Sequence, residues 1–346
     1  MARAINTKKV KIQEQKPDLR VVKEVKTKPY SDIDLNNWKE YSHIKTDTWW
    51  EFDSRDKSHG HSNDYHGNYI PQLAQQLYER FTQKGDVVLD MFLGSGTSAI
   101  EALNMGRRCI GVELKPEQVE IVSNKFSQKE LVTDVNIICN DSADEGVKEK
   151  IQARLDIMRR DKAQFLVLHP PYDDIIKFSD RKEDLSNCAT TEEFYDLFKK
   201  VAKNGYDMLE KGRFAALIIG DKYANGEIVP LGADCAAKMR EIGFKMKAVI
   251  VKNMEGNERA KGKTANLWRY RALNGGFIFL NTSIFMSSKK YRNIKNGNIY
   301  EVIRDDVINC TNANDDQIMV LYKSYEHPEL LFVREIKEFN VKFEEV

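Results

Sequence analysis

Val87-Val88-Leu89-Asp90-Met91-Phe92-Leu93-Gly94-Ser95-Gly96-Thr97 is the stretch that decides the fold of this chain of 346 residues. An apolar run that leads into a glycine-rich turn is typical of a buried parallel strand followed by a helix. Gly94 and Gly96 let the backbone approach a ligand closely, and the next helix presents free N–H groups to it. The stretch therefore predicts a nucleotide-like ligand at the carboxyl end of a parallel strand.

Strand-like and helical segments alternate on both sides of this stretch, which is the pattern of an α/β domain. Continuous apolar runs predict strands at 87–91, 108–113, 135–139, 165–169, 214–220, 244–251 and 277–286. Apolar residues at helical spacing predict helices at 71–81, 98–104, 116–126, 148–158, 191–209 and 231–242. We expect a Rossmann-like fold: a seven-stranded, mostly parallel sheet with helices on both faces. The last two strands lack a full helix between them, so we expect an antiparallel strand at the edge.

Acidic residues stand at the ends of the first three strands. Asp90 precedes the glycine turn, Glu113 ends the next strand, and Asp141 follows the third. A carboxylate at Asp90 repels a pyrophosphate but attracts a sulfonium or ammonium group, and the third glycine of a dinucleotide fingerprint is missing. This favours S-adenosylmethionine, with Glu113 accepting from the ribose hydroxyls and Asp141 from the adenine amino group. The predicted cofactor residues here are Asp90, Phe92, Gly94, Ser95, Gly96, Thr97, Glu113 and Asp141.

His169-Pro170-Pro171-Tyr172 directly follows the apolar run at 165–168. The amino group of a nucleobase is a poor nucleophile because its lone pair is delocalised into the ring, so its methylation calls for acceptors that hold the amino hydrogens. A Pro-Pro step can aim a carbonyl inward without a competing N–H, and the side chain before it supplies the second acceptor. Tyr172 can stack on a flipped-out base. We predict these four residues to be catalytic.

The two strings, in this order, resemble the S-adenosylmethionine-dependent amino-methyltransferases that modify adenine N6 or cytosine N4 in DNA. The resemblance covers about residues 31–290 and implies a site-specific enzyme of restriction-modification or orphan type. It also implies that a segment containing His66 and Asn68 closes over the methionine end of the cofactor, and that a loop at Phe178 covers the base pocket. The family usually has Asp, Asn or Ser before Pro-Pro-Tyr, whereas this chain has His169. Neutral imidazole can accept a hydrogen bond and imidazolium cannot, so we expect activity to fall as the pH drops through the His169 pKa.

Composition limits the class of protein and its partners. The formal net charge is +1, but residues 1–30 hold nine Lys or Arg against three Asp or Glu, and residues 252–295 hold ten against two. Local basic patches suit contact with phosphates, with a solvated surface as the alternative. No apolar run reaches the roughly 20 residues of a membrane helix, and the five cysteines lack metal-binding spacing. We expect a cytoplasmic protein without a metal or a membrane partner.

Residues 1–30 are charged and without periodicity, which predicts a flexible basic arm. The resemblance implies a catalytic domain at 31–295 with a target-recognition insert at 252–276, and residues 296–346 are left as a C-terminal extension. Strand-like runs at 318–323 and 330–333 mark the extension. Basic and aromatic side chains together suit nucleic-acid contact. The residues predicted to make it are Lys252, Arg259, Lys261, Lys263, Trp268, Arg269, Tyr270 and Arg271.

The expected partners are duplex DNA with a flipped base, a cognate restriction enzyme and a second copy of the chain. Methylation of RNA or of protein glutamine is the alternative activity, and a non-catalytic DNA-binding homologue is the alternative without activity. The sequence leaves open the target base, the recognition sequence, the oligomeric state and the role of residues 296–346.

Overall fold

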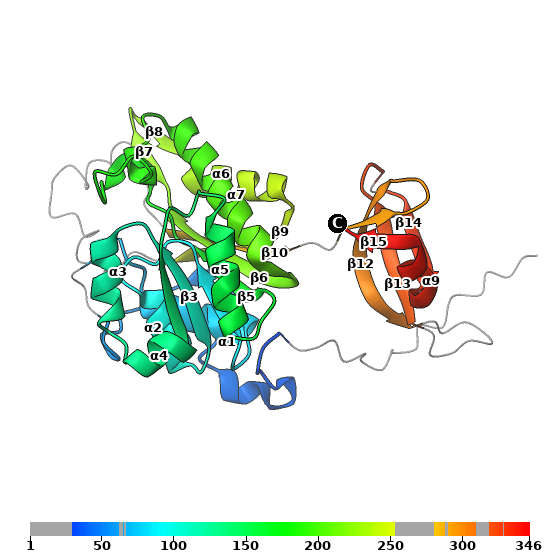
Figure 1. Cartoon of the computed structure of the whole chain (residues 1–346), viewed down its shortest axis with the longest axis horizontal. Helices are drawn as coiled ribbons and strands as arrows, with labels where there is room; N and C mark the ends of the chain where they lie inside the picture. Colours follow the sequence, from blue (N-terminus) through cyan, green and yellow to red (C-terminus); the bar gives the residue numbers. More distant parts are fainter. Residues whose placement is uncertain are drawn as a thin grey trace, which may run out of the picture.

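The computed structural model describes residues 30–61, 65, 67–252, 280–287, 290–308, 318–327 and 329–346. Except for Tyr30, the expected basic arm lies outside these residues, as does the expected insert except for Lys252. Figure 1 shows a large α/β sheet with its helices and a smaller sheet formed by the C-terminal residues. In the described part of the chain, none of the helices combines the length and apolar character needed to span a bilayer.

The large sheet has eight strands in the order β1-β9-β10-β6-β5-β2-β3-β4. Their bounds are β1 (Trp49–Trp50), β2 (Val87–Asp90), β3 (Arg108–Glu113), β4 (Val135–Cys139), β5 (Ala163–Leu168), β6 (Leu209–Gly220), β9 (Phe244–Lys252) and β10 (Leu280–Ser287). Neighbouring strands are parallel, except that β10 is antiparallel to both β6 and β9. The expected Rossmann-like, mostly parallel α/β fold is confirmed.

The last two predicted strands pair antiparallel as expected, but the antiparallel strand β10 lies inside the sheet and not at its edge. β10 pairs with β6 on one side and with β9 on the other. Its residues Thr282, Ile284 and Phe285 are buried, which suits an interior strand covered on both faces. The two residues of β1 pair with the end of β9 and form an eighth strand where seven were expected.

The helices cover both faces of the large sheet. Their bounds are α1 (Pro71–Phe81), α2 (Thr97–Asn104), α3 (Pro116–Ser123), α4 (Gln128–Thr133), α5 (Val147–Ile157), α6 (Thr191–Met208) and α7 (Leu231–Ile242). Residues of α1, α2 and α3 pack in one core with Val88, and residues of α5, α6 and α7 pack in the other with Val87 and Leu89. Strand β2 thus feeds both cores, which explains its continuous apolar sequence.

Short elements complete the domain. They are the 3₁₀ helices η1 (Leu35–Tyr41), η2 (Asp173–Ile175) and η3 (Leu185–Asn187), and the hairpin strands β7 (Lys222–Ala224) and β8 (Glu227–Val229). The η2 turn begins directly after Tyr172, and β7 begins just after β6 ends. Both therefore lie where the parallel strands β5 and β6 end, at the carboxyl edge of the sheet.

The C-terminal residues form an antiparallel sheet in the order β14-β13-β12-β11-β15. The bounds are β11 (Lys290–Asn293), β12 (Ile299–Ile308), β13 (Ile318–Ser324), β14 (Leu331–Glu335), α9 (Ile336–Lys342) and β15 (Phe343–Glu345). Val302, Val320, Tyr322, Phe339 and Phe343 make its core. The two strand-like runs expected in this region correspond to β13 and β14.

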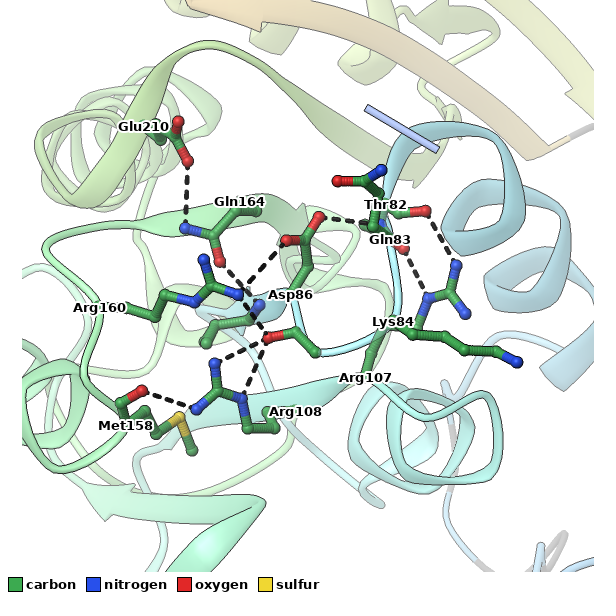
Figure 2. A network of polar contacts seen from close by, with 12 residues as sticks. Thr82, Gln83, Lys84, Asp86, Arg107, Arg108, Met158, Arg160, Gln164 and Glu210 are labelled. Atoms are coloured by element: carbon green, nitrogen blue, oxygen red, sulfur yellow. Dashed lines mark hydrogen bonds and ion pairs between the residues drawn. The ribbon is translucent and has the colours of Figure 1, made fainter. Parts of the chain in front are cut away.

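Arginine side chains gather at the amino ends of the strands, opposite the carboxyl edge (Figure 2). Arg108 donates to the carbonyls of Gly85 and Met158, at 2.7 Å for the shortest hydrogen bond to each. Arg160 donates to the same Gly85 carbonyl at 3.0 Å and forms an ion pair with Asp86. These charge-assisted bonds hold the connections into β2, β3 and β5 together.

Candidate active site

The glycine turn and the His-Pro-Pro-Tyr turn follow neighbouring strands. β2 and β5 are parallel, with Val88 opposite Phe165 and Asp90 opposite Val167. The two turns therefore leave the carboxyl edge of the sheet side by side, as the sequence predicts. Residues of both turns line one pocket, together with residues that follow β3 and β4. This is the juxtaposition that a transfer between two ligands requires.

Glycine is required by the geometry of the turn after β2. Gly94 and Gly96 have φ angles of 53° and 82°, in the left-handed region that favours glycine. A Cβ atom on Gly96 would lie 2.6 Å from Cγ1 of Val122, so a side chain has no room there. The Gly94 carbonyl accepts a hydrogen bond from Nε2 of Gln118 at 3.0 Å. The turn is thus fixed against α3 while its other side faces the pocket.

The Glu113 carboxylate joins the end of β3 to the glycine turn. Its Oε2 accepts from the Gly94 N–H at 2.9 Å, and its Oε1 accepts from the Lys115 N–H at 3.0 Å. Burial raises the pKa of Glu113, and these two hydrogen bonds oppose the rise. The side chain lines the pocket. A fixed carboxylate with further acceptor capacity suits a ligand that donates hydrogen bonds.

Asp141 occupies the corresponding place after β4. Its Oδ1 accepts from the Ala143 N–H at 2.8 Å, and the residue lines the pocket. Burial raises the pKa of Asp141. The neighbouring Ser142 donates from Oγ to the Met91 carbonyl at 2.6 Å, which ties this segment to the end of β2.

Asp90 supports the glycine turn from beneath. It is 1% exposed and is not among the described residues that line the pocket. Oδ1 accepts from the Phe92 N–H at 2.9 Å, and Oδ2 accepts from the Ser98 hydroxyl. Burial raises the pKa of Asp90 to about 6, against these hydrogen bonds. The carboxylate therefore acts on the pocket through its charge and through the shape of the turn.

His169 lies between two tyrosine rings. The Tyr69 ring contacts it edge-on, with centroids 5.1 Å apart and an interplanar angle of 85°. The Tyr172 ring lies 5.9 Å away at 73°, and its hydroxyl is 3.2 Å from Nε2 of His169. Burial lowers the pKa of His169 to about 4. The imidazole is therefore neutral at physiological pH and retains a ring nitrogen that can accept a hydrogen bond.

Two segments far apart in sequence meet over the pocket. Tyr65 stacks on Phe178, with centroids 6.1 Å apart and an interplanar angle of 25°. Nζ of Lys115 lies 5.2 Å from the Tyr65 ring centroid and donates to the Phe178 carbonyl at 3.4 Å. Asn68 donates to Oγ of Ser95 at 3.2 Å. The expected closing segment and the expected loop at Phe178 thus cover the same pocket.

Comparison with known proteins agrees with this geometry. The model of the family described as DNA methylase matches residues 3–124. Type II methyltransferase M.BglI from Bacillus subtilis is 44% identical over 64 residues, which are 18% of this chain and 18% of that protein. Type II methyltransferase M.MjaII from Methanocaldococcus jannaschii is 33% identical over 67 residues, 19% of this chain and 13% of that protein. Over part of its length the chain is therefore similar to DNA methylases.

The sequence matches cover a limited part of each protein. This chain spans less than a fifth of the length of M.BglI and of M.MjaII, at 18% and 13%. Among solved structures, TrmN from Thermus thermophilus is similar with a TM-score of 0.42 and 15% sequence identity. That likeness covers 64% of this chain and 50% of TrmN.

Ten of the fourteen residues predicted for catalysis and cofactor binding meet in the pocket. Those that line it are Asn68, Phe92, Gly94, Ser95, Thr97, Glu113, Asp141, His169, Pro170 and Pro171. Asp90, Gly96 and Tyr172 adjoin lining residues. Lys252 ends β9 with a buried side chain, and burial lowers its pKa. Apart from Lys252, the residues predicted to contact nucleic acid lie outside the described residues, as does His66, which was predicted to bind the cofactor.

Sequence reasoning missed Tyr65, Lys115 and the support that Ser98 gives to Asp90. Tyr65 stands beside the segment that the family resemblance marks, and Lys115 stands two residues after Glu113. Both positions could have been suspected from this proximity. Their contacts with Phe178 could not, because Phe178 is distant in sequence and no periodic pattern links the segments.

Proposed function

We propose that this chain transfers the methyl group of S-adenosylmethionine to the exocyclic amino group of adenine or cytosine in DNA. The pairing of β2 with β5 carries the proposal, because it brings the two turns to one pocket. The names of M.BglI and M.MjaII, both Type II methyltransferases, support a role in restriction-modification. The partners that follow are duplex DNA, a cognate restriction enzyme and a second copy of the chain. Such an enzyme would work beside the DNA, and we propose a cytoplasmic location for it.

The chemistry of the pocket residues fits S-adenosylmethionine. Glu113 offers buried carboxylate oxygens to the ribose hydroxyls, and Asp141 offers an acceptor to the adenine amino group. The glycine turn places the N-terminal N–H groups of α2 next to the pocket. When bound, the cofactor supplies an electrophilic methyl group on its sulfonium. Asn68 and the Tyr65–Phe178 stack would enclose it.

In the proposed reaction the protein orients the amine. Tyr172 stacks on the flipped base, whose unstacking costs a few kcal/mol that the pocket must offset. A carbonyl of the Pro170-Pro171 step and a ring nitrogen of His169 each accept an amino hydrogen, which localises the lone pair on nitrogen. The bound cofactor would supply its methyl group to the amine nitrogen held by His169 and the Pro170-Pro171 carbonyl, and the methylated amine would then release a proton to solvent.

The position of the recognition insert supports a nucleic-acid substrate. Lys252 and Leu280 pair across β9 and β10. The parallel strand β9 ends there, at the same carboxyl edge as the pocket. The two strands that flank the predicted insert therefore meet on the side where a flipped base would enter.

Labelled methyl transfer tests the proposal. The protein is incubated with labelled S-adenosylmethionine and with duplex DNA, tRNA or protein, and the DNA is digested for mass detection of methylated nucleosides. We expect label in DNA as N6-methyladenine or N4-methylcytosine, and a higher Tm with the cofactor. Label in tRNA or protein alone would show that DNA is not the substrate. A Tm shift without any methyl transfer would show that the chain binds the cofactor but is not a catalyst. Tyr195→Phe serves as the matched control for variants of the site, because the Tyr195 hydroxyl bonds to Asp234 and neither residue lines the pocket.

A further inference from the structure

Asp173 directly follows the His-Pro-Pro-Tyr turn and has an uncommon backbone. Its φ is 53°, in the left-handed region where residues other than glycine are infrequent and Asp and Asn are the best tolerated. Its side chain is buried, with the residue 2% exposed. A non-glycine residue remains in this region only where its surroundings hold it there. The contacts of Asp173 therefore show which neighbours keep its backbone in this conformation.

One carboxylate oxygen of Asp173 joins three elements. Oδ2 accepts from Oγ1 of Thr191, the first residue of α6, at 2.7 Å. The same oxygen accepts from Nζ of Lys222, the first residue of β7, at 3.0 Å. Lys222 also pairs with Asp174, and its side chain is 16% exposed. A largely buried ion pair thus binds the end of the catalytic turn to the segment that follows β6.

This pair acts on the turn at the residue next to it. The backbone of Asp173 sets the path by which the chain leaves Tyr172, and the Tyr172 hydroxyl lies 3.2 Å from Nε2 of His169. Neither Asp173 nor Lys222 is among the described residues that line the pocket. The shortest route along the chain from this pair to the pocket is through Tyr172 to His169.

We propose that Asp173 and Lys222 are positioning residues that fix the ring of Tyr172 for stacking on the flipped base. The role rests on the proposed function, because it needs a base in the pocket. A pair that only stabilised the fold would change the free energy of unfolding and leave stacking and turnover intact. A positioning pair changes kcat and stacking while cofactor binding stays the same.

Four variants test the pair. Asp173→Asn tolerates the left-handed backbone and still accepts from Thr191, but it removes the charge that faces Lys222. Lys222→Met keeps the length of the side chain without its charge, and Lys222→Arg keeps the pair. We expect each of the two charge-removing variants to lower kcat by about tenfold, with cofactor affinity within about twofold of wild type. Lys222→Arg should retain most of the wild-type kcat, because it keeps the ion pair with Asp173. The double variant Asp173→Asn/Lys222→Met should lose no more than the worse single variant, because the partners act as a unit.

Fluorescence gives a readout that does not depend on turnover. A duplex with 2-aminopurine at the position that the wild-type protein methylates reports on the flipped base, since stacking on Tyr172 quenches its emission. Both charge-removing variants should give brighter complexes than wild type and than Tyr195→Phe. Variants with a lower Tm but wild-type kcat and quenching would overturn the positioning role, as would strictly additive losses in the double variant. A wild-type protein that methylates no DNA would instead overturn the proposed function, and this role with it.

Discussion

The imidazole of His169 stands where the family that the sequence resembles usually has an amide, a hydroxyl or a carboxylate. Its burial between Tyr69 and Tyr172 lowers its pKa to about 4, below the ordinary value of about 6.5. The neutral form is the hydrogen-bond acceptor, and it predominates above the pKa of the folded protein. The loss of activity that the sequence predicts on acidification is therefore displaced to a lower pH than an exposed histidine would give.

We accordingly predict that kcat, measured at saturating cofactor, is independent of His169 ionisation between about pH 5.5 and about pH 8. Protonation should remove activity only as the pH falls towards about 4. The pH profile of kcat for wild type and for His169→Asn checks this, because asparagine also accepts but does not titrate. A wild-type loss between about pH 5.5 and about pH 8 that His169→Asn abolishes would contradict it.

Asp90 provides a test through stability. Its pKa is raised from 3.8 in the unfolded chain to about 6 in the fold, so its contribution is fully present below 3.8 and is lost as the pH rises through about 6. Asp90→Asn lacks this titration. Relative to wild type, we expect its free energy of unfolding to gain about 2–3 kcal/mol between about pH 4 and about pH 8. Denaturant unfolding at both pH values measures the gain. The exposed substitution Asp161→Asn is the control, and equal shifts in both variants would refute the assignment.

At the scale of elements, the site depends on a bond between the end of β3 and the turn after β2. Glu113→Gln keeps one acceptor oxygen where the carboxylate serves both Gly94 and Lys115. We predict a loss of S-adenosylmethionine affinity of about 10- to 100-fold. The amide can no longer accept from the N–H groups of both Gly94 and Lys115, and it offers fewer acceptor sites to the ribose hydroxyls. Calorimetric titration measures the loss, with Glu117→Gln on α3 as the control. Unchanged affinity in Glu113→Gln would remove Glu113 from the cofactor site.

The elements themselves were largely predictable. The strands that feed two cores have continuous apolar sequences, and the spacing of Leu73, Leu77 and Phe81 predicts α1 with the bounds observed. The order in which strands pair was less accessible. Nothing in the local sequence pattern of β10 distinguishes an edge position from an interior one. Its position depends on its pairing with both β6 and β9, which are distant in sequence. The hairpin β7–β8 and most of the C-terminal sheet escaped prediction because their strands are short or mixed in polarity.

The candidate site could be predicted where a motif and a strand end coincide. Gly94, Glu113, Asp141 and His169 follow from that rule, because parallel strands bring their carboxyl ends to one edge. The supporting contacts could not be predicted in this way. The pairing of Asp173 with Lys222 depends on how the turn after β5 meets the segment after β6 in three dimensions.

On the scale of the whole molecule, the basic residues predicted to meet DNA are concentrated in the insert. We expect DNA binding to weaken steeply as salt rises from about 50 to about 300 mM, because binding to phosphates releases counterions. Replacing Arg259, Lys261 and Lys263 with Ser should lower DNA affinity and flatten the slope of log Kd against log salt, by about one for each phosphate that is no longer neutralised. Fluorescence anisotropy measures both quantities. Cofactor affinity should not change, because most of the residues predicted to bind the cofactor lie in the pocket after β2, β3 and β4.

Equal DNA affinity at the two salt concentrations would contradict this prediction, as would a triple variant with the wild-type slope. Lys252 provides a control for the triple variant, because its side chain is buried. Its replacement by Met should leave the salt slope unaltered, because a buried ammonium group cannot track the phosphate backbone.

The register of β9 and β10 has a consequence for how such enzymes acquire new specificities. Lys252 and Leu280 are cross-strand partners, so the ladder holds together the described residues on either side of the predicted insert. A loop closed at its base loses little when its length changes, since the entropic cost grows only with the logarithm of length. We therefore expect segments of different length to be accepted between these two residues. If the predicted insert reads DNA, grafts from DNA methylases at this position should change the sequence that is methylated while the residues that line the pocket stay in place.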